Sequence, residues 1–138
     1  MAEEADFDFG DNVDRSAFEQ ILDMDEEDDR DFSKSIVFGF LEQAEQTFTK
    51  MDVALKERNL PELSSLGHFL KGSSATLGFT KVKDECEKIQ HYGHKKNETG
   101  EVDEPDEDKL IRLSRQSIDE AKKAYKIVDA LMKRYYAE

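Results

Sequence analysis

The chain has 138 residues, with 33 acidic and 20 basic side chains and a formal net charge of −13. This acidity argues against binding to nucleic acid or to an anionic membrane surface, because phosphate groups would repel it. Its length suits one domain with a single core. One cysteine rules out an internal disulfide and a cysteine-rich zinc site. The N-terminus lacks a signal-peptide pattern and no apolar run reaches the roughly 20 residues of a membrane span, so we expect an intracellular protein.

The acidic residues are concentrated in two segments. Residues 1–31 carry 14 acids and 2 bases, and residues 98–108 carry 7 acids and no base. We expect residues 1–12 to form a flexible acidic tail and residues 13–138 to form the domain. An amphipathic pattern over residues 13–24 predicts a short N-terminal helix.

Longer helices are predicted where apolar residues repeat at helical spacing. They cover about residues 31–58, 61–77, 80–96 and 106–136, and residues 97–105 read as a loop. No segment alternates with the period of a strand. We therefore predict an all-α fold, an antiparallel four-helix bundle with a short additional N-terminal helix.

The third of these long helices carries a histidine on its exposed face. At about 100° per residue, the predicted buried stripe contains Leu63, Leu66, Leu70, Ser73 and Leu77. His68 lies opposite this stripe, on a face with Ser64, Ser65, Lys71, Gly72 and Ala75.

Three of these neighbours suit the exchange of a phosphoryl group on His68. Gly72 removes a side chain that would crowd the imidazole, and Lys71 places a cation where the phosphoryl group would lie. Ala75 keeps the surface flat for a protein to approach. A glycine within a helix costs about 1 kcal/mol relative to alanine, which indicates a functional reason for Gly72. The alternative is a solvated histidine beside a glycine of no special purpose.

The run His68-Phe69-Leu70-Lys71-Gly72-Ser73-Ser74-Ala75-Thr76-Leu77-Gly78 resembles the signature of histidine-containing phosphotransfer (HPt) domains. The similarity to fungal stand-alone members of this family covers about residues 13–97. In this family a histidine takes a phosphoryl group from the aspartate of one receiver domain and passes it to another. The resemblance implies that His68 becomes the phosphohistidine, Lys71 offsets phosphoryl charge, and Gly72 gives access. It further implies that Gln90 hydrogen-bonds the imidazole and orients it.

The resemblance also implies the partners, which are the receiver domain of a hybrid histidine kinase and downstream response regulators. It places the chain, as a monomer, in the cytoplasm and nucleus, in a pathway that responds to osmotic or oxidative stress. We expect no cofactor, since Mg²⁺ would be held by the partner's receiver domain. Without a glycine-rich phosphate loop, the chain should have no ATP-dependent kinase activity.

Docking of a receiver domain requires an apolar surface near His68. The candidate residues are Ala17, Phe18, Ile21, Leu22, Phe32 and Ile36, with Ser65 and Ala75 beside the histidine. The alternative is that the apolar side chains cap the end of the bundle. At the level of function, the alternative is a helical adaptor that binds receiver domains without phosphotransfer. Such an adaptor would not need His68, Lys71 and Gly72 together.

Two further features could carry chemistry. His91 and His94 are three residues apart and could share a metal ion, but no further ligands are evident. Cys86 falls on the inward face of its helix, where a packed thiol is expected rather than a reactive one.

Overall fold

The helices form where apolar residues repeat at helical spacing, and the prediction of an all-α class is confirmed. The computed structural model describes residues 9–137 of the chain. Its elements, in chain order, are η1 (Gly10–Asn12), α2 (Arg15–Leu22), α3 (Asp31–Lys56), α4 (Leu60–Leu77), α5 (Thr80–Gly93) and α6 (Glu107–Ala137). Within these described residues no β-strand occurs.

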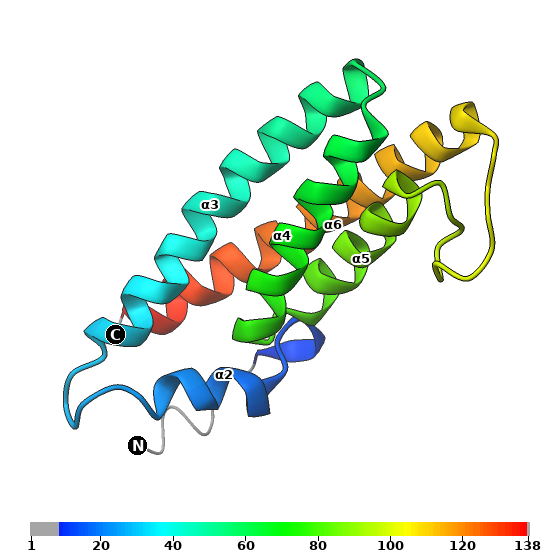
Figure 1. Ribbon diagram of the computed structural model, residues 1–138. Helices are drawn as coiled ribbons and strands as arrows, with labels where there is room; N and C mark the ends of the chain where they lie inside the picture. Colours follow the sequence, from blue (N-terminus) through cyan, green and yellow to red (C-terminus); the bar gives the residue numbers. More distant parts are fainter. Residues whose placement is uncertain (1–8, 138) are drawn as a thin grey trace.

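The four long helices surround one core, as predicted. Helix α3 contacts α4, α4 contacts α5, α5 contacts α6, and α6 returns to contact α3. Consecutive long helices run in opposite directions, and α2 lies across one end of the bundle (Figure 1). Over residues 9–137, no helix is long and apolar enough to cross a membrane.

The N-terminal segment differs from the expectation of a tail up to residue 12. Residues 1–8 lie outside the described part of the chain, but Phe9 is only 5% exposed and Asn12 is buried. The Phe9 ring packs edge-on against Phe18 at 5.3 Å between centroids. The packed region therefore includes Phe9, because this aromatic side chain completes the core at the end of the bundle.

Aromatic rings fill that end of the core. The centroid of the Phe18 ring lies 5.7 Å from that of Tyr135 and 6.5 Å from that of Phe79. The centroids of the Phe79 and Phe40 rings are 5.1 Å apart. These contacts bring α2, α3, α6 and the α4–α5 connection together. Since aromatic residues bury large areas, the cluster fixes the position of α2 on the bundle.

The connection from α2 to α3 is anchored to the C-terminal end of α6. Asp25 accepts hydrogen bonds from the backbone nitrogen of Ser33 at 2.7 Å and from its hydroxyl at 2.6 Å. The Tyr136 hydroxyl donates to the Ser33 hydroxyl oxygen at 2.7 Å. Asp25 thus satisfies a free N–H in the first turn of α3, a role that the nominal cap residue, Arg30, does not fill.

Helix α5 ends at Gly93, earlier than the predicted end at residue 96, and the loop to α6 is longer than expected. The Asn97 side chain accepts hydrogen bonds from the backbone nitrogens of Glu101 and Val102 and from the Thr99 hydroxyl. This local network competes with helix continuation and gives the acidic loop a defined shape.

Candidate functional site

Helix α4 carries the candidate site, and local sequence signals set its ends. The Asn59 side chain accepts a hydrogen bond from the backbone nitrogen of Glu62 at 3.1 Å, and Pro61 lies in the first turn. Gly78 ends the helix with a φ of 80°, a left-handed conformation that glycine adopts without strain. His68 lies at the middle of this helix with its side chain exposed, as predicted.

The buried face of α4 is turned further toward α5 than the sequence predicted. Its buried residues are Leu60, Leu63, Ser64, Gly67, Leu70, Ser74 and Leu77. Ser64, predicted on the exposed face, is only 4% exposed, whereas Leu66 and Ser73 of the predicted stripe are half-buried. The reason is the close contact between α4 and α5, which covers an edge of α4 that helical spacing alone leaves open.

Two glycines that the sequence analysis missed make this close contact possible. A Cβ atom built on Gly67 would lie 2.8 Å from the carbonyl oxygen of Cys86 and 2.9 Å from the backbone nitrogen of Gln90. A Cβ on Gly93 would lie 2.5 Å from the backbone nitrogen of Ser64. The sequence signal is a glycine in each of two helices that are neighbours in the chain.

The surface around His68 is open on one side. A Cβ atom built on Gly72 meets no atom within 4 Å, so a partner can approach the imidazole over this position. Ser65 and Ala75 are exposed on the same helix. Within residues 9–137, the His68 imidazole makes no hydrogen bond or ion pair, which leaves a ring nitrogen available as a nucleophile.

Lys71 follows His68 by three residues and is half-buried. Its Nζ lies 3.6 Å from Oε2 of Glu87, a residue of α5. Residues three apart on a helix are neighbours, so the ammonium group is attached close to His68. The structure therefore places a cation beside the histidine, but paired with an acid of the next helix that sequence reasoning did not single out.

Gln90 lies on α5 with its side chain half-buried, and its backbone contacts Gly67, the residue before His68. Its Oε1 atom is buried and has no hydrogen-bond partner within the described residues. The structure places Gln90 next to the turn of α4 that carries His68, but it contains no hydrogen bond between the two side chains. The orienting role of Gln90 stays a prediction.

The predicted docking patch is only partly exposed. Phe18 is 0% exposed and Ile21 is 7% exposed, so both belong to the core, as the alternative interpretation stated. The prediction of Phe18 and Ile21 as docking residues is wrong, because the apolar face of α2 turns inward onto the aromatic cluster.

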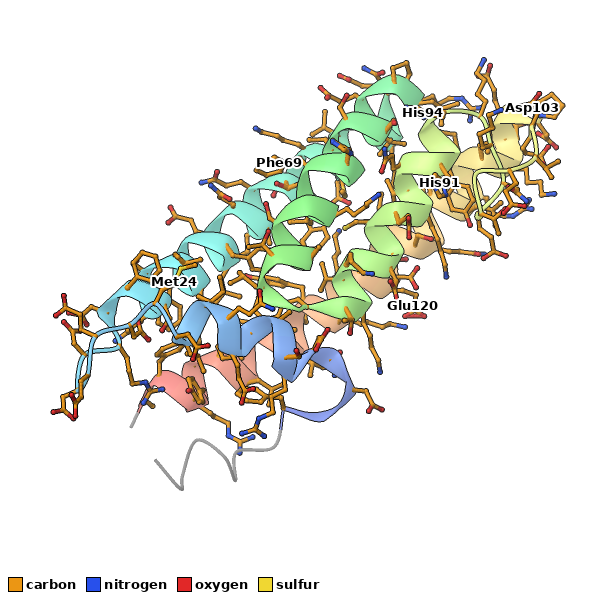
Figure 2. The ribbon with its side chains drawn as sticks, turned by 60° about the horizontal axis from the view of Figure 1, so that its bottom comes forward. Met24, Phe69, His91, His94, Asp103 and Glu120 are labelled. Atoms are coloured by element: carbon orange, nitrogen blue, oxygen red, sulfur yellow. The ribbon has the colours of Figure 1, made fainter. Side chains whose placement is uncertain are left out.

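Other apolar side chains remain on the surface. Ala17, Leu22 and Ile36 are half-buried, and Phe32 is 46% exposed. Two residues that the sequence analysis did not choose, Met24 and Phe69, are 61% and 48% exposed; both project from the surface in Figure 2. The sequence signal for Phe69 was its position directly after His68 in the chain.

The other two histidines and the cysteine are accounted for by structure. The His91 ring bonds through Nδ1 to the Glu98 carbonyl at 2.8 Å, which ties α5 to the acidic loop, and His94 is exposed (Figure 2). Residues 9–137 contain no cluster of three metal-ligating side chains. Burial raises the pKa of the Cys86 thiol to about 12, so it stays protonated and unreactive at neutral pH.

Comparison with known proteins agrees with this geometry. The chain is 44% identical over 124 residues, or 90% of its length, to multistep phosphorelay regulator 1 of Schizosaccharomyces pombe, and the match covers 42% of that protein. It is 56% identical over 62% of its length to the phosphorelay intermediate protein YPD1 of Candida albicans, covering 46% of it. The chain thus spans less than half the length of these curated relatives.

The fold matches one chain of a solved complex, that of the Saccharomyces cerevisiae histidine phosphotransfer signaling protein Ypd1 and the receiver domain of its downstream response regulator Ssk1. The TM-score is 0.78 at 32% identity, over 92% of this chain and 95% of that one. Residues 36–124 match the family described as the Hpt domain, a span that includes α4 and α5 with His68, Lys71, Gly72 and Gln90. The chain therefore belongs to the Hpt domain family.

Proposed function

We propose that this chain is a phosphocarrier in a multistep phosphorelay. In this role His68 accepts a phosphoryl group from the receiver-domain aspartate of a hybrid histidine kinase and passes it to the aspartates of response regulators. The observation that carries the proposal is the exposed His68 imidazole, with Lys71 beside it and open space over Gly72, in a chain of the Hpt domain family.

The transfer step follows from the chemistry of the imidazole. One ring nitrogen attacks the phosphorus atom of the aspartyl phosphate with its lone pair, and the other nitrogen keeps its proton. A P–N bond forms while the P–O bond to the aspartate breaks, and the carboxylate leaves with the electron pair. A neutral imidazole carries on one nitrogen the lone pair that this attack requires. The reverse reaction, on a second receiver domain, discharges the histidine.

The exposed position of His68 and the open space over Gly72 fit a carrier that meets two different partners. The groups that stabilise the transition state would come from the receiver domain, including the Mg²⁺ that it holds; this chain supplies Lys71. We assign docking to Ala17, Leu22, Phe32 and Ile36 on the α2–α3 side, with Ser65 and Ala75 beside His68. The solved relative with a receiver domain bound supports this class of partner.

The charge of the helices suits these partners. Residues 32–97, which include α4 and α5, hold 10 bases and 8 acids, in contrast to the acidic N-terminal segment. Such a surface can approach an acidic receiver pocket and a phosphoryl group without net repulsion. Action as a monomer in the cytoplasm and nucleus, under osmotic or oxidative stress, is part of the proposal and rests on the resemblance to fungal phosphorelay proteins.

The test is incubation of the wild-type chain and His68→Gln with a receiver domain carrying ³²P on its aspartate. We expect acid-labile label on the wild type and none on His68→Gln, with both variants equally helical. Label on His68→Gln, or none on a folded wild type, would refute phosphotransfer at His68. Binding of the receiver domain without any transfer would favour the adaptor.

A further inference from the structure

The ion pair between Lys71 and Glu87 has a consequence for the proposed phosphotransfer, on which this inference rests. The Lys71 side chain is 32% exposed and that of Glu87 is 44% exposed, and their charged atoms are 3.6 Å apart. This separation is too long for a hydrogen bond, so the pair is held by charge and by the packing of α4 on α5. Within residues 9–137, neither side chain has another hydrogen-bond or ion-pair partner.

We propose that Glu87 restrains Lys71 in the unphosphorylated protein, and that Lys71 changes partner when His68 is phosphorylated. A phosphoryl group on His68 brings roughly two negative charges to the turn of α4 that carries Lys71. The ammonium group then has two anionic partners, the phosphoryl oxygens on its own helix and the carboxylate of Glu87 on α5. Glu87 is thus a positioning residue that acts on the reacting group through Lys71.

Competition between Glu87 and the phosphoryl group for Lys71 determines whether Glu87 stabilises or destabilises the phosphohistidine. Contact of Lys71 with the phosphoryl oxygens competes with its contact with Glu87, because both anions attract the same ammonium group. Glu87 therefore makes the phosphohistidine less stable than Lys71 alone would make it. A carrier needs such a balance, because a phosphohistidine that is held too firmly is not passed on to the next aspartate.

The exposure of the Lys71–Glu87 pair to solvent limits how strongly Glu87 can change the stability of the phosphohistidine. Measured couplings of exposed ion pairs correspond to a change of about 1.4- to five-fold in an equilibrium constant. Such pairs are screened by salt over a Debye length of about 8 Å at 0.15 M, so the effect should shrink as the ionic strength rises.

The test is the equilibrium distribution of ³²P between a receiver domain and this chain, measured for the wild type and Glu87→Gln at low and high salt. We expect Glu87→Gln to shift label about 1.4- to five-fold toward His68 at low salt, and less at high salt. Asp84→Asn is the matched control, since it removes one charge from the same helix at an exposed residue that pairs with Lys83. It should leave the distribution unchanged.

Lys71→Met provides the second arm. In that background Glu87→Gln should shift the distribution less than in the wild type, because there is no ammonium group to release. An equal shift in both backgrounds would mean that Glu87 acts by direct repulsion, and an unchanged distribution for Glu87→Gln would mean that it does not act at all; either result overturns the inference. In both cases label on the wild type leaves phosphotransfer itself intact. A wild type that accepts no label overturns the proposed function and this inference with it.

Discussion

Replacement of glycine by alanine at two positions of α4, Gly67 and Gly72, should change the stability of the protein in opposite directions. Gly67 faces the backbone of α5, whereas Gly72 faces open space. In Gly67→Ala the new methyl group would lie 2.8 Å and 2.9 Å from two backbone atoms of α5, which cannot move as a flexible side chain can. In Gly72→Ala the methyl group meets no atom within 4 Å.

The expected magnitudes come from two opposing terms. Replacement of a mid-helix glycine by alanine stabilises by about 0.5–1 kcal/mol through backbone entropy. The free energy of unfolding of Gly72→Ala should therefore be higher by this amount. Insertion of a methyl group into a filled contact costs about 1–3 kcal/mol, and two contacts with backbone place Gly67→Ala at the upper part of this range. The free energy of unfolding of Gly67→Ala should therefore fall by about 2 kcal/mol.

Urea unfolding followed by circular dichroism measures the difference. With an unchanged slope, the midpoint should fall for Gly67→Ala and rise slightly for Gly72→Ala, and the two free energies of unfolding should differ by about 2–3 kcal/mol. Equal stability of the two variants would refute the idea that Gly67 permits the close approach of α5. A large change in slope would indicate an altered unfolded state instead.

Other positions give further predictions. Gly72→Gln should keep near-normal helicity by circular dichroism yet strongly slow the transfer of ³²P to the histidine, and an unchanged rate would refute the access argument. Asp25→Ala should lower the free energy of unfolding by about 1–2 kcal/mol, because Ser33 loses the acceptor for its backbone nitrogen; Glu27→Ala, in the same acidic run, should change it little. Burial, then nearby carboxylates, raise the pKa of Tyr125 in the folded state, so unfolding releases its proton and stability should fall as the pH rises above about 10. Tyr125→Phe should show a smaller fall in the urea midpoint between pH 9 and 11, and an identical fall would exclude this contribution.

The features that could be predicted from the sequence are those fixed within one helix. Helical spacing places His68, Lys71 and Gly72 on consecutive turns of one helix, and the structure keeps them there. The cap at Asn59 and the left-handed Gly78 are equally local. The bundle itself also follows, since each long helix has an apolar stripe that must be covered.

The features that could not be predicted depend on which helix covers which face. An amphipathic helix as short as α2 has an apolar side, but its pattern does not state whether a partner or the bundle covers it, and Phe18 turned out to be core. The contact of Gly67 with the α5 backbone and the pairing of Lys71 with Glu87 both join two helices. Their geometry is a property of packing, which single-helix periodicity does not contain.

The two glycines of α4 together give the site its asymmetry. Gly67 lets α5 approach so closely that Gln90 and Glu87 lie beside the turn that carries His68, and Gly72 leaves the other side of that turn bare. One side of the histidine is thus built by this chain, and the other is open for a partner to complete. A site of this kind can hold a nucleophile with one cation beside it, but the transition state of phosphoryl transfer needs more positive charge than one lysine supplies. In the proposed phosphotransfer, the missing charge would arrive with the receiver domain, and reaction would be coupled to docking.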